Sequence, residues 1–204
     1  PRVWDGGPIH EHQEYAGRIT MVDGTTRNDN SFHAIHVTGT VIGNGTNVNA
    51  KGMAPAATAR TFDWNDDESE AITEAMNGML LSNHSYGTPI SSISTTPWYI
   101  GAYSADAYNW DMIAYTFPNY LPVMSAGNDG GNANPSPTTN NYDKLNGNKN
   151  AKNILTIANS NDATVNATTG AITAGGAINT SSSQGPTDDR RIKPDVAGNG
   201  TGLT

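Results

Sequence analysis

The sequence contains no cysteine, which excludes disulfide bonds and thiolate chemistry but leaves the cellular compartment open. Positive charge is scarce as well: 11 Lys and Arg stand against 19 Asp and Glu, which gives a net charge of −8. Binding to a nucleic-acid backbone needs clustered Lys and Arg, so we expect no nucleic-acid partner. No apolar run approaches the roughly 20 residues that cross a bilayer, so we expect no membrane-spanning segment.

Hydrophobic residues are also few, at 35 % of the 204 positions. Many of the remaining positions are Gly, Asn, Thr or Ser, which indicates long polar loops around a small hydrophobic core. The length fits one domain, and we expect residues 1–204 to form a single one. Because the chain opens at Pro1 without a Met, inside what reads as a strand, we expect it to be an internal piece of a longer gene product.

Apolar strands alternate with helical patterns along the chain, which predicts an α/β fold. A helix is expected from Ser31, with Asn30 or Ser31 as its N-cap, to a stop at Gly43 or Gly45. A second helix should turn Ile72, Ala75, Met76 and Met79 to the core and stop at Asn77-Gly78, and residues 132–150 should form a surface excursion. The other predicted elements are strands at 2–4, 18–22, 58–62, 79–82, 121–124 and 154–158, a helix at 102–117 and irregular β structure at 161–180.

Three polar groups stand where predicted strands or helices begin or end. Asp5 follows the first strand and precedes Gly6-Gly7, and Asn128 follows the strand at 121–124. His33 and His36 lie three residues apart, so they share one face of the predicted helix. An imidazole near a helix end can transfer protons near neutral pH. Together a carboxylate, an imidazole and an amide form a candidate catalytic constellation.

Five sequence blocks occur in a specific order: Asp5-Gly6-Gly7, then His-x-x-His-Val-x-Gly-Thr, Ser-Ala-Gly-Asn, Ser-Ser-x-Gly-Pro-Thr and Lys-Pro-Asp-Val. In this order they resemble the subtilisin-like serine proteases (subtilases), and the resemblance covers nearly the whole chain. It implies a three-layer fold, a mostly parallel central sheet with helices on both faces, incomplete here at both ends.

The resemblance also implies roles for individual residues. Asp5 matches the catalytic acid, His33 the general base, His36 a structural second histidine and Asn128 the side-chain donor of the oxyanion hole. Two backbone edges would hold an extended peptide and wall the pocket for the residue before the cleaved bond. These edges are Ser85-Tyr86-Gly87 and Ser125-Ala126-Gly127.

Three features depart from the family pattern. Ala34-Ile35 replaces Gly-Thr between the histidines, and Gly6 stands where Ser or Thr usually follows the acid, which removes one hydrogen bond to that carboxylate. The third departure is the nucleophile, which the family carries in Gly-Thr-Ser-x-Ala-x-Pro after the Lys-Pro-Asp block. Gly-Thr occurs at Gly24, Gly39, Gly45, Gly87 and Gly200, never followed by Ser.

We therefore expect a serine endopeptidase whose serine lies outside this chain, so that the 204 residues alone are inactive. The resemblance implies a polypeptide substrate, a missing C-terminal part of the same domain as partner, and a secreted or extracytoplasmic, bacterial protein. No cofactor is required. Structural calcium is compatible with the acidic loops, but no segment has EF-hand-like spacing that would locate it.

Two alternatives stay open. One is a catalytically inactive subtilase fold that binds peptides. The other is a metal-dependent hydrolase that uses His10, His12, His33 and His36. The second ranks last, because no Glu lies between His33 and His36 as the zinc-protease helix pattern requires.

Overall fold

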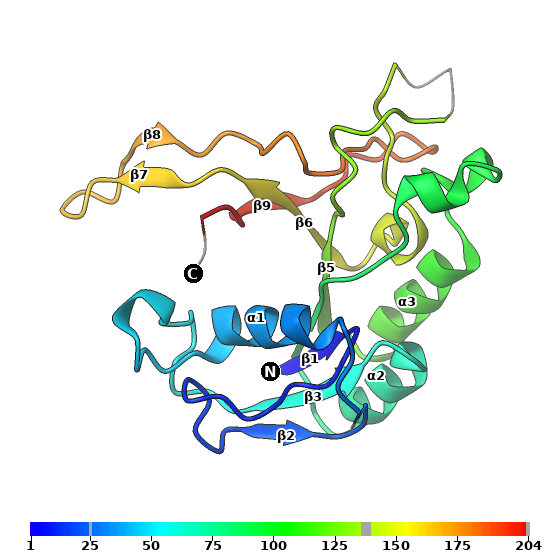
Figure 1. Ribbon diagram of the computed structural model, residues 1–204. Helices are drawn as coiled ribbons and strands as arrows, with labels where there is room; N and C mark the ends of the chain where they lie inside the picture. Colours follow the sequence, from blue (N-terminus) through cyan, green and yellow to red (C-terminus); the bar gives the residue numbers. More distant parts are fainter. Residues whose placement is uncertain (25, 136–139, 203–204) are drawn as a thin grey trace. The chain divides into compact units, whose positions relative to one another are not determined.

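The computed structural model describes residues 1–24, 26–135 and 140–202 (Figure 1). Parallel strands joined by helices dominate the chain, with short 3-10 turns (η) in the connections. In chain order the elements are β1 (Arg2–Asp5), β2 (Ile19–Met21), α1 (Ser31–Ile42), η1 (Val48–Ala50), β3 (Ala59–Asp63), α2 (Asp67–Met76), β4 (Leu81–His84), η2 (Ile90–Ile93), η3 (Pro97–Tyr99), α3 (Ala105–Thr116), β5 (Leu121–Ser125), η4 (Gly147–Asn150), β6 (Leu155–Ser160), β7 (Ala163–Val165), β8 (Ile172–Gly175) and β9 (Val196–Asn199).

Within the described residues, seven strands are hydrogen-bonded in the order β2-β3-β1-β4-β5-β6-β9, and β7 and β8 form a separate antiparallel pair. The pairs β1–β3, β1–β4, β2–β3 and β6–β9 are parallel. The predicted α/β class with a mostly parallel sheet is therefore confirmed. None of the helices in this part of the chain is both long and apolar enough to span a membrane.

The chain divides into two compact units. The first comprises residues 1–86 and 113–123, and the second comprises residues 87–112 and the described part of 124–203. The prediction of one domain over 1–204 stays a prediction, and the two units are described separately below.

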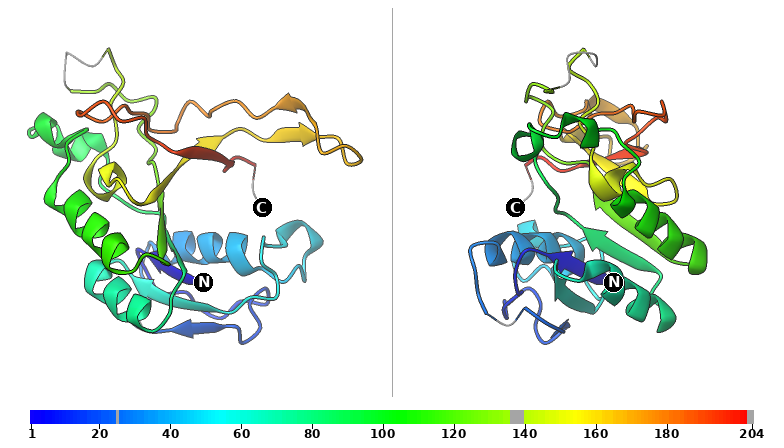
Figure 2. Two further views of the ribbon diagram at one scale, coloured as in Figure 1. Left: turned by 180° about the vertical axis from the view of Figure 1, so that it is seen from behind. Right: turned by 90° about the vertical axis from the view of Figure 1, so that its right-hand side faces the viewer.

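In the first unit, alternate residues of β1 contact helices on opposite faces of the sheet. Arg2 and Trp4 point to α2, where Arg2 Nε donates to Glu74 at 2.7 Å and Trp4 Nε1 donates to Glu70 at 2.9 Å. Asp5 points the other way, to α1. Figures 1 and 2 show these two helices on either side of the strands. The carboxyl end of β1 thus delivers Asp5 to the α1 side of the sheet.

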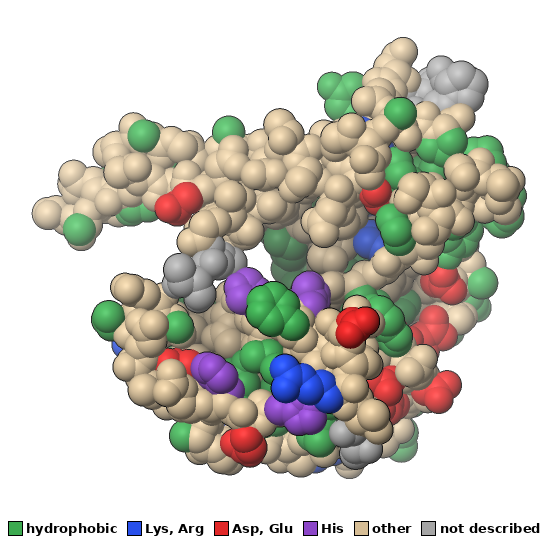
Figure 3. Space-filling model, in the orientation of Figure 1, with side chains coloured by type: hydrophobic (Ala, Val, Ile, Leu, Met, Phe, Trp, Pro, Cys, Tyr) green, Lys and Arg blue, Asp and Glu red, His purple; other side chains and the backbone are tan. Residues whose placement is uncertain are grey.

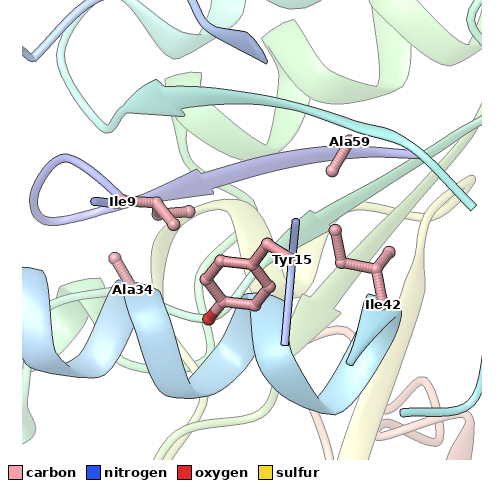
Figure 4. Close-up of a cluster of buried hydrophobic side chains, with 5 residues drawn as sticks. All are labelled: Ile9, Tyr15, Ala34, Ile42 and Ala59. Atoms are coloured by element: carbon pink, nitrogen blue, oxygen red, sulfur yellow. The ribbon is translucent and has the colours of Figure 1, made fainter. Parts of the chain in front are cut away.

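The helix α1 packs on the sheet through small and apolar residues. Ala34, Thr38 and Ile42, four residues apart, are fully buried, while His33 and His36 are exposed. The ring of Tyr15 fills the space between α1 and β3 (Figure 4), and its hydroxyl donates to the carbonyl of Ile35. This packing leaves both histidines of the helix on the open side.

Most predicted elements are confirmed with shifts of a few residues, but two predictions were wrong. Of the four predicted core residues, Ala75 and Met79 are buried, but Ile72 and Met76 are 40 % and 73 % exposed, because α2 buries Ala71 and Glu74 instead. Residues 132–150 are not wholly a surface excursion: Lys144, Leu145 and much of η4 are buried. Residues 136–139 of that segment lie outside the described residues.

Candidate functional site

The centre of the candidate site is a contact between a carboxylate and an imidazole in the first unit. The two carboxylate oxygens of Asp5 lie 2.8 and 2.9 Å from Nδ1 of His33. Asp5 comes from the carboxyl end of β1 and His33 from the first turn of α1. The structure therefore brings together two of the three predicted catalytic side chains.

This contact fixes the chemical state of the histidine. An ionised carboxylate only accepts hydrogen bonds, so Nδ1 carries the proton and Nε2 of the neutral ring keeps its lone pair. The hydrogen bond to Asp5 raises the pKa of His33 above 6.5, although partial burial opposes the rise. Such a ring is oriented and basic, which is what a general base needs.

The glycines after Asp5 let the start of α1 approach the strand end. The amide of Gly6 donates to Asp5 Oδ1 at 2.7 Å, and Asn28 Nδ2 donates to the carbonyl of Gly6 at 3.0 Å. A Cβ at Gly7 would lie 2.3 Å from Asn28 Oδ1, and one at Gly6 would lie 2.7 Å from the Trp64 ring. The backbone amide of Gly6 thus binds the carboxylate where a Ser or Thr side chain would collide with Trp64.

Asn28, which sequence reasoning missed, organises the helix start. Its backbone amide donates to Ser31 Oγ at 3.1 Å, and its side-chain oxygen accepts from the amide of Asn30 at 2.9 Å. Asn30 occupies the predicted N-cap position but makes no side-chain cap hydrogen bond. An Asn two residues before a predicted N-cap, facing an Asp-Gly-Gly turn, was the available signal.

A buried hydrogen-bond chain positions the end of β4, where Ser85 and Tyr86 were predicted to bind substrate. The Tyr86 hydroxyl donates to Asp67 at 2.5 Å and lies 2.7 Å from His84 Nδ1. His84 Nε2 lies 2.7 Å from Ser82 Oγ. Burial lowers the pKa of His84 to about 3, so this ring is neutral.

The directions of these hydrogen bonds follow from Asp67, whose carboxylate can only accept. Because the Tyr86 proton goes to Asp67, the Tyr86 oxygen accepts from Nδ1–H of His84, and Nε2 must accept from Ser82. His84 also stacks on Trp4, with centroids 5.0 Å apart. This geometry gives His84 a structural role. The Tyr86 side chain is held inside the first unit, so a peptide contact there would use its backbone.

Asn128 belongs to the second unit and lies with Ala126 and Gly127 in the turn after β5, whose last residue is Ser125. The carbonyl of Gly127 accepts from the amide of Ser183 at 2.9 Å, and Ser183 Oγ accepts from the amide of Asp129 at 3.0 Å. Ser183 is buried, whereas Asn128 is exposed. The turn is therefore anchored on both sides of Asn128, and its amide side chain is accessible.

The remaining histidines do not assemble a metal centre. In the part of the chain that the structure describes, no group of three or more His, Cys, Asp or Glu side chains is placed to hold a metal ion. His12 Nδ1 instead accepts from the amide of Glu14 at 3.3 Å. Figure 3 shows that histidine side chains gather on the face of the first unit around α1. We assign no residue to calcium or zinc.

Fold and site together define a mostly parallel α/β protein with a carboxylate–imidazole pair at a strand end. The sequence model of the subtilase family, Peptidase_S8, matches residues 10–204, so the chain belongs to the subtilase family. Asp5 precedes the matched range, so its assignment depends on its contact with His33.

Comparison with solved structures shows the same fold. The chain is similar to the "Structure of self-cleaved protease domain of PatA", with a TM-score of 0.55 and 18 % sequence identity. The similarity covers 90 % of this chain and 61 % of that chain, so this chain spans about three fifths of its neighbour. No curated protein matches this chain.

Proposed function

We propose that this chain provides the acid, the base and the oxyanion donor of a subtilisin-type serine endopeptidase, whose nucleophilic serine lies outside residues 1–204. The contact between Asp5 and His33 Nδ1 carries the proposal. A buried carboxylate that receives Nδ1–H leaves Nε2 free to take a proton from a hydroxyl group.

In the proposed reaction, His33 Nε2 takes the serine proton while the serine oxygen attacks the peptide carbonyl. The resulting oxyanion accepts a hydrogen bond from the Asn128 amide, and loss of such a donor costs about 100- to 1000-fold in kcat, a value measured for subtilisin. His33 then returns the proton to the leaving amine, and water hydrolyses the acyl-enzyme by the same route. Asp5 keeps the ring oriented and stabilises its charged form.

The proposed substrate is an extended polypeptide. Its main chain would pair with two backbone edges, Ser85-Tyr86-Gly87 and Ser125-Ala126-Gly127. Because main-chain hydrogen bonds do not depend on the side chains, peptides of many sequences could bind in this way. The proposal requires no cofactor, and it includes export from a bacterial cell. That the neighbour is described as a protease domain, and is longer than this chain, supports both the activity and a serine elsewhere in the protein.

A serine-directed inhibitor tests the proposal. Incubation of the protein that contains this chain with a fluorophosphonate should label one serine, and peptide mapping should place it beyond residue 204. His33→Ala should abolish labelling and peptide hydrolysis. The matched control is His36→Ala, on the same exposed face of α1, which should keep both. Absence of labelling and hydrolysis in the native protein would contradict the proposal, as would labelling that survives His33→Ala.

The second candidate function is a peptide-binding module without catalysis. Its supporting observation is that none of the five Gly-Thr dipeptides is followed by Ser. Peptide binding by the native protein, with no hydrolysis and no labelled serine, would favour this alternative.

A further inference from the structure

Lys149 has an almost completely buried side chain, which the sequence did not predict. The residue is only 4 % exposed and lies in η4 of the second unit. Among the described residues, the groups that act on its ammonium group are the carboxylates of Asp129 and Asp106, and neither is hydrogen-bonded to it. Buried lysines are rare unless paired, because burial removes the water that stabilises the charge. A buried lysine that has no hydrogen-bonded carboxylate therefore needs an explanation.

The end of this side chain lies beside the last glycine of each predicted backbone edge, Gly87 and Gly127, which belong to the same unit. A Cβ at Gly87 would lie 2.0 Å from Lys149 Nζ, and one at Gly127 would lie 3.7 Å from Lys149 Cε. The ammonium group therefore passes directly against the backbone of Gly87. Gly87 therefore needs to be glycine unless the lysine moves, and the cation, Gly87 and Gly127 fit together as one local structure.

Three hydrogen bonds hold this arrangement in place. Asn146 Nδ2 donates to the carbonyl of Thr88 at 3.0 Å, which ties η4 to the segment after Gly87. Thr156 Oγ1 donates to the carbonyl of Lys149 at 3.1 Å. The amide of Ser183 donates to the carbonyl of Gly127 at 2.9 Å. The backbone around the cation is thus fixed on all three sides.

The two carboxylates whose charges act on Lys149, Asp129 and Asp106, are hydrogen-bonded to other groups. Asp129 accepts from the amide of Ile90 at 3.2 Å and from Asn132 Nδ2 at 2.8 Å, and Asp106 accepts from the Tyr99 hydroxyl. Burial lowers the pKa of Lys149 to about 8, while Asp129 and Asp106 oppose that shift. Lys149 is thus mostly charged at neutral pH, and neither of these carboxylates is hydrogen-bonded to it.

We propose that Lys149 lies in the pocket for the residue before the cleaved bond and selects substrates with Glu or Asp at that position. A carboxylate there supplies the missing partner, and a charge-assisted hydrogen bond in a desolvated pocket is stronger than a neutral one. A basic side chain would place a second cation beside the first. This inference rests on the proposed function for the position of the peptide, but the preference itself needs no serine.

Equilibrium binding tests the preference apart from catalysis. Acetyl tetrapeptide amides that differ only in a terminal Glu, Gln or Lys are titrated into the 204-residue protein, so that the side chain supplies the only carboxylate. The Glu peptide should bind about 10- to 100-fold more tightly than the Gln peptide, with the Lys peptide weakest. Equal affinities, or no binding of any peptide at millimolar concentration, would overturn the inference.

Two lysine variants test whether Lys149 is the residue that gives the preference for Glu. Lys149→Met should remove the difference between Glu and Gln peptides, while Lys152→Met, an exposed lysine three residues away, should keep it. If Lys149→Met does not fold by circular dichroism, the peptide series with the unmodified protein still decides. Hydrolysis assays on the protein that contains this chain separate the two proposals: cleavage without an acidic preference refutes only this inference, and acid-selective binding without cleavage refutes only the protease.

Discussion

Both carboxylate oxygens of Asp5 lie within hydrogen-bonding distance of one atom, Nδ1 of His33, yet the two side chains differ sharply in burial. The Asp5 side chain is 2 % exposed and the His33 side chain is 53 % exposed. The ring therefore has one edge held by a buried acceptor while about half of its surface meets solvent. This asymmetry supports a base that must exchange protons with a bound substrate.

Asp5→Asn should leave the fold intact and remove most of the activity of the protein that contains this chain. An amide can donate as well as accept, so it no longer selects the tautomer with the proton on Nδ1. We expect a loss of about 10⁴-fold in kcat, the size found for such replacements in serine peptidases. Steady-state kinetics on a peptide substrate would measure it. A loss below 10-fold would argue against a catalytic acid at this position.

The titration of His33 can be followed without activity, by NMR of its imidazole protons in the 204-residue protein. The hydrogen bond to Asp5 raises the pKa of His33 above 6.5. In Asp5→Asn the opposing effect of burial remains, so the pKa should fall below its value in the unmodified protein. The pair stabilises the fold fully below the unfolded-state pKa and loses this contribution as pH rises through the folded-state pKa. An unchanged pKa in the variant would contradict the interpretation.

The sequence predicts features that depend on neighbouring residues better than features that depend on residues far apart in the chain. The helix Ser31–Ile42 follows from local pattern, and its observed end at Gly43 is one of the two predicted stops, Gly43 and Gly45. The buried face of α2 was predicted only in part, because Glu74 is buried against two arginines from neighbouring strands, Arg2 and Arg60. No periodicity within a helix encodes such partners. A polar residue that is buried by distant ones looks exposed in the sequence.

Burial by residues distant in the sequence also explains why the buried position of Lys149 was not predicted. It stands in a segment of Asn, Gly and Lys that reads as a surface loop, and its burial depends on Gly87, 62 positions earlier. The Asp5 and His33 pair was predictable because a family pattern preserves the spacing of its parts. Lys149 belongs to none of the five blocks, so only the structure shows that it lies beside Gly87 and Gly127.

Glu74 should be a major stabilising residue of the first unit. Its carboxylate, in a residue 5 % exposed, accepts from Arg2 at 2.7 Å and from Arg60 at 2.9 Å. Burial alone would raise its pKa, but the two arginines outweigh burial and lower it. Glu74→Gln should cost about 2 kcal/mol of unfolding free energy, because two cations lose a charged acceptor. Urea denaturation would measure it, and a loss under about 0.5 kcal/mol, typical of surface changes, would contradict this role.

Glu14 ties the loop before β2 to the segment after α1. Its carboxylate accepts from the backbone amides of Gly45, Thr46 and Asn47 at 2.8, 3.0 and 2.7 Å. The amide of Asn47 is the main reason that its pKa is lowered from 4.5, with burial opposing. A lowered carboxyl pKa contributes stability above the unfolded-state pKa and loses it as pH falls through the folded-state value.

Glu14→Gln should therefore lower the urea midpoint at pH 7, and the gap to the unmodified protein should narrow as pH falls below 4.5. Glu11→Gln, three residues away in an exposed position, is the control and should leave the midpoint unchanged at both pH values. A gap that stays constant down to pH 3 would show that the charge of Glu14 contributes nothing.

The preference for an acidic residue should depend on pH through Lys149. Its pKa is about 8, so the ammonium form dominates below that pH and declines above it. The ratio of Glu to Gln peptide affinities should therefore fall toward one as pH rises above about 8, although a bound carboxylate shifts the midpoint upward by favouring the charged form. Lys149→Arg provides the matched test, since a guanidinium stays charged throughout this range. That variant should keep its preference at high pH. If both proteins lose it together, the pH dependence arises from another group and Lys149 does not select the substrate.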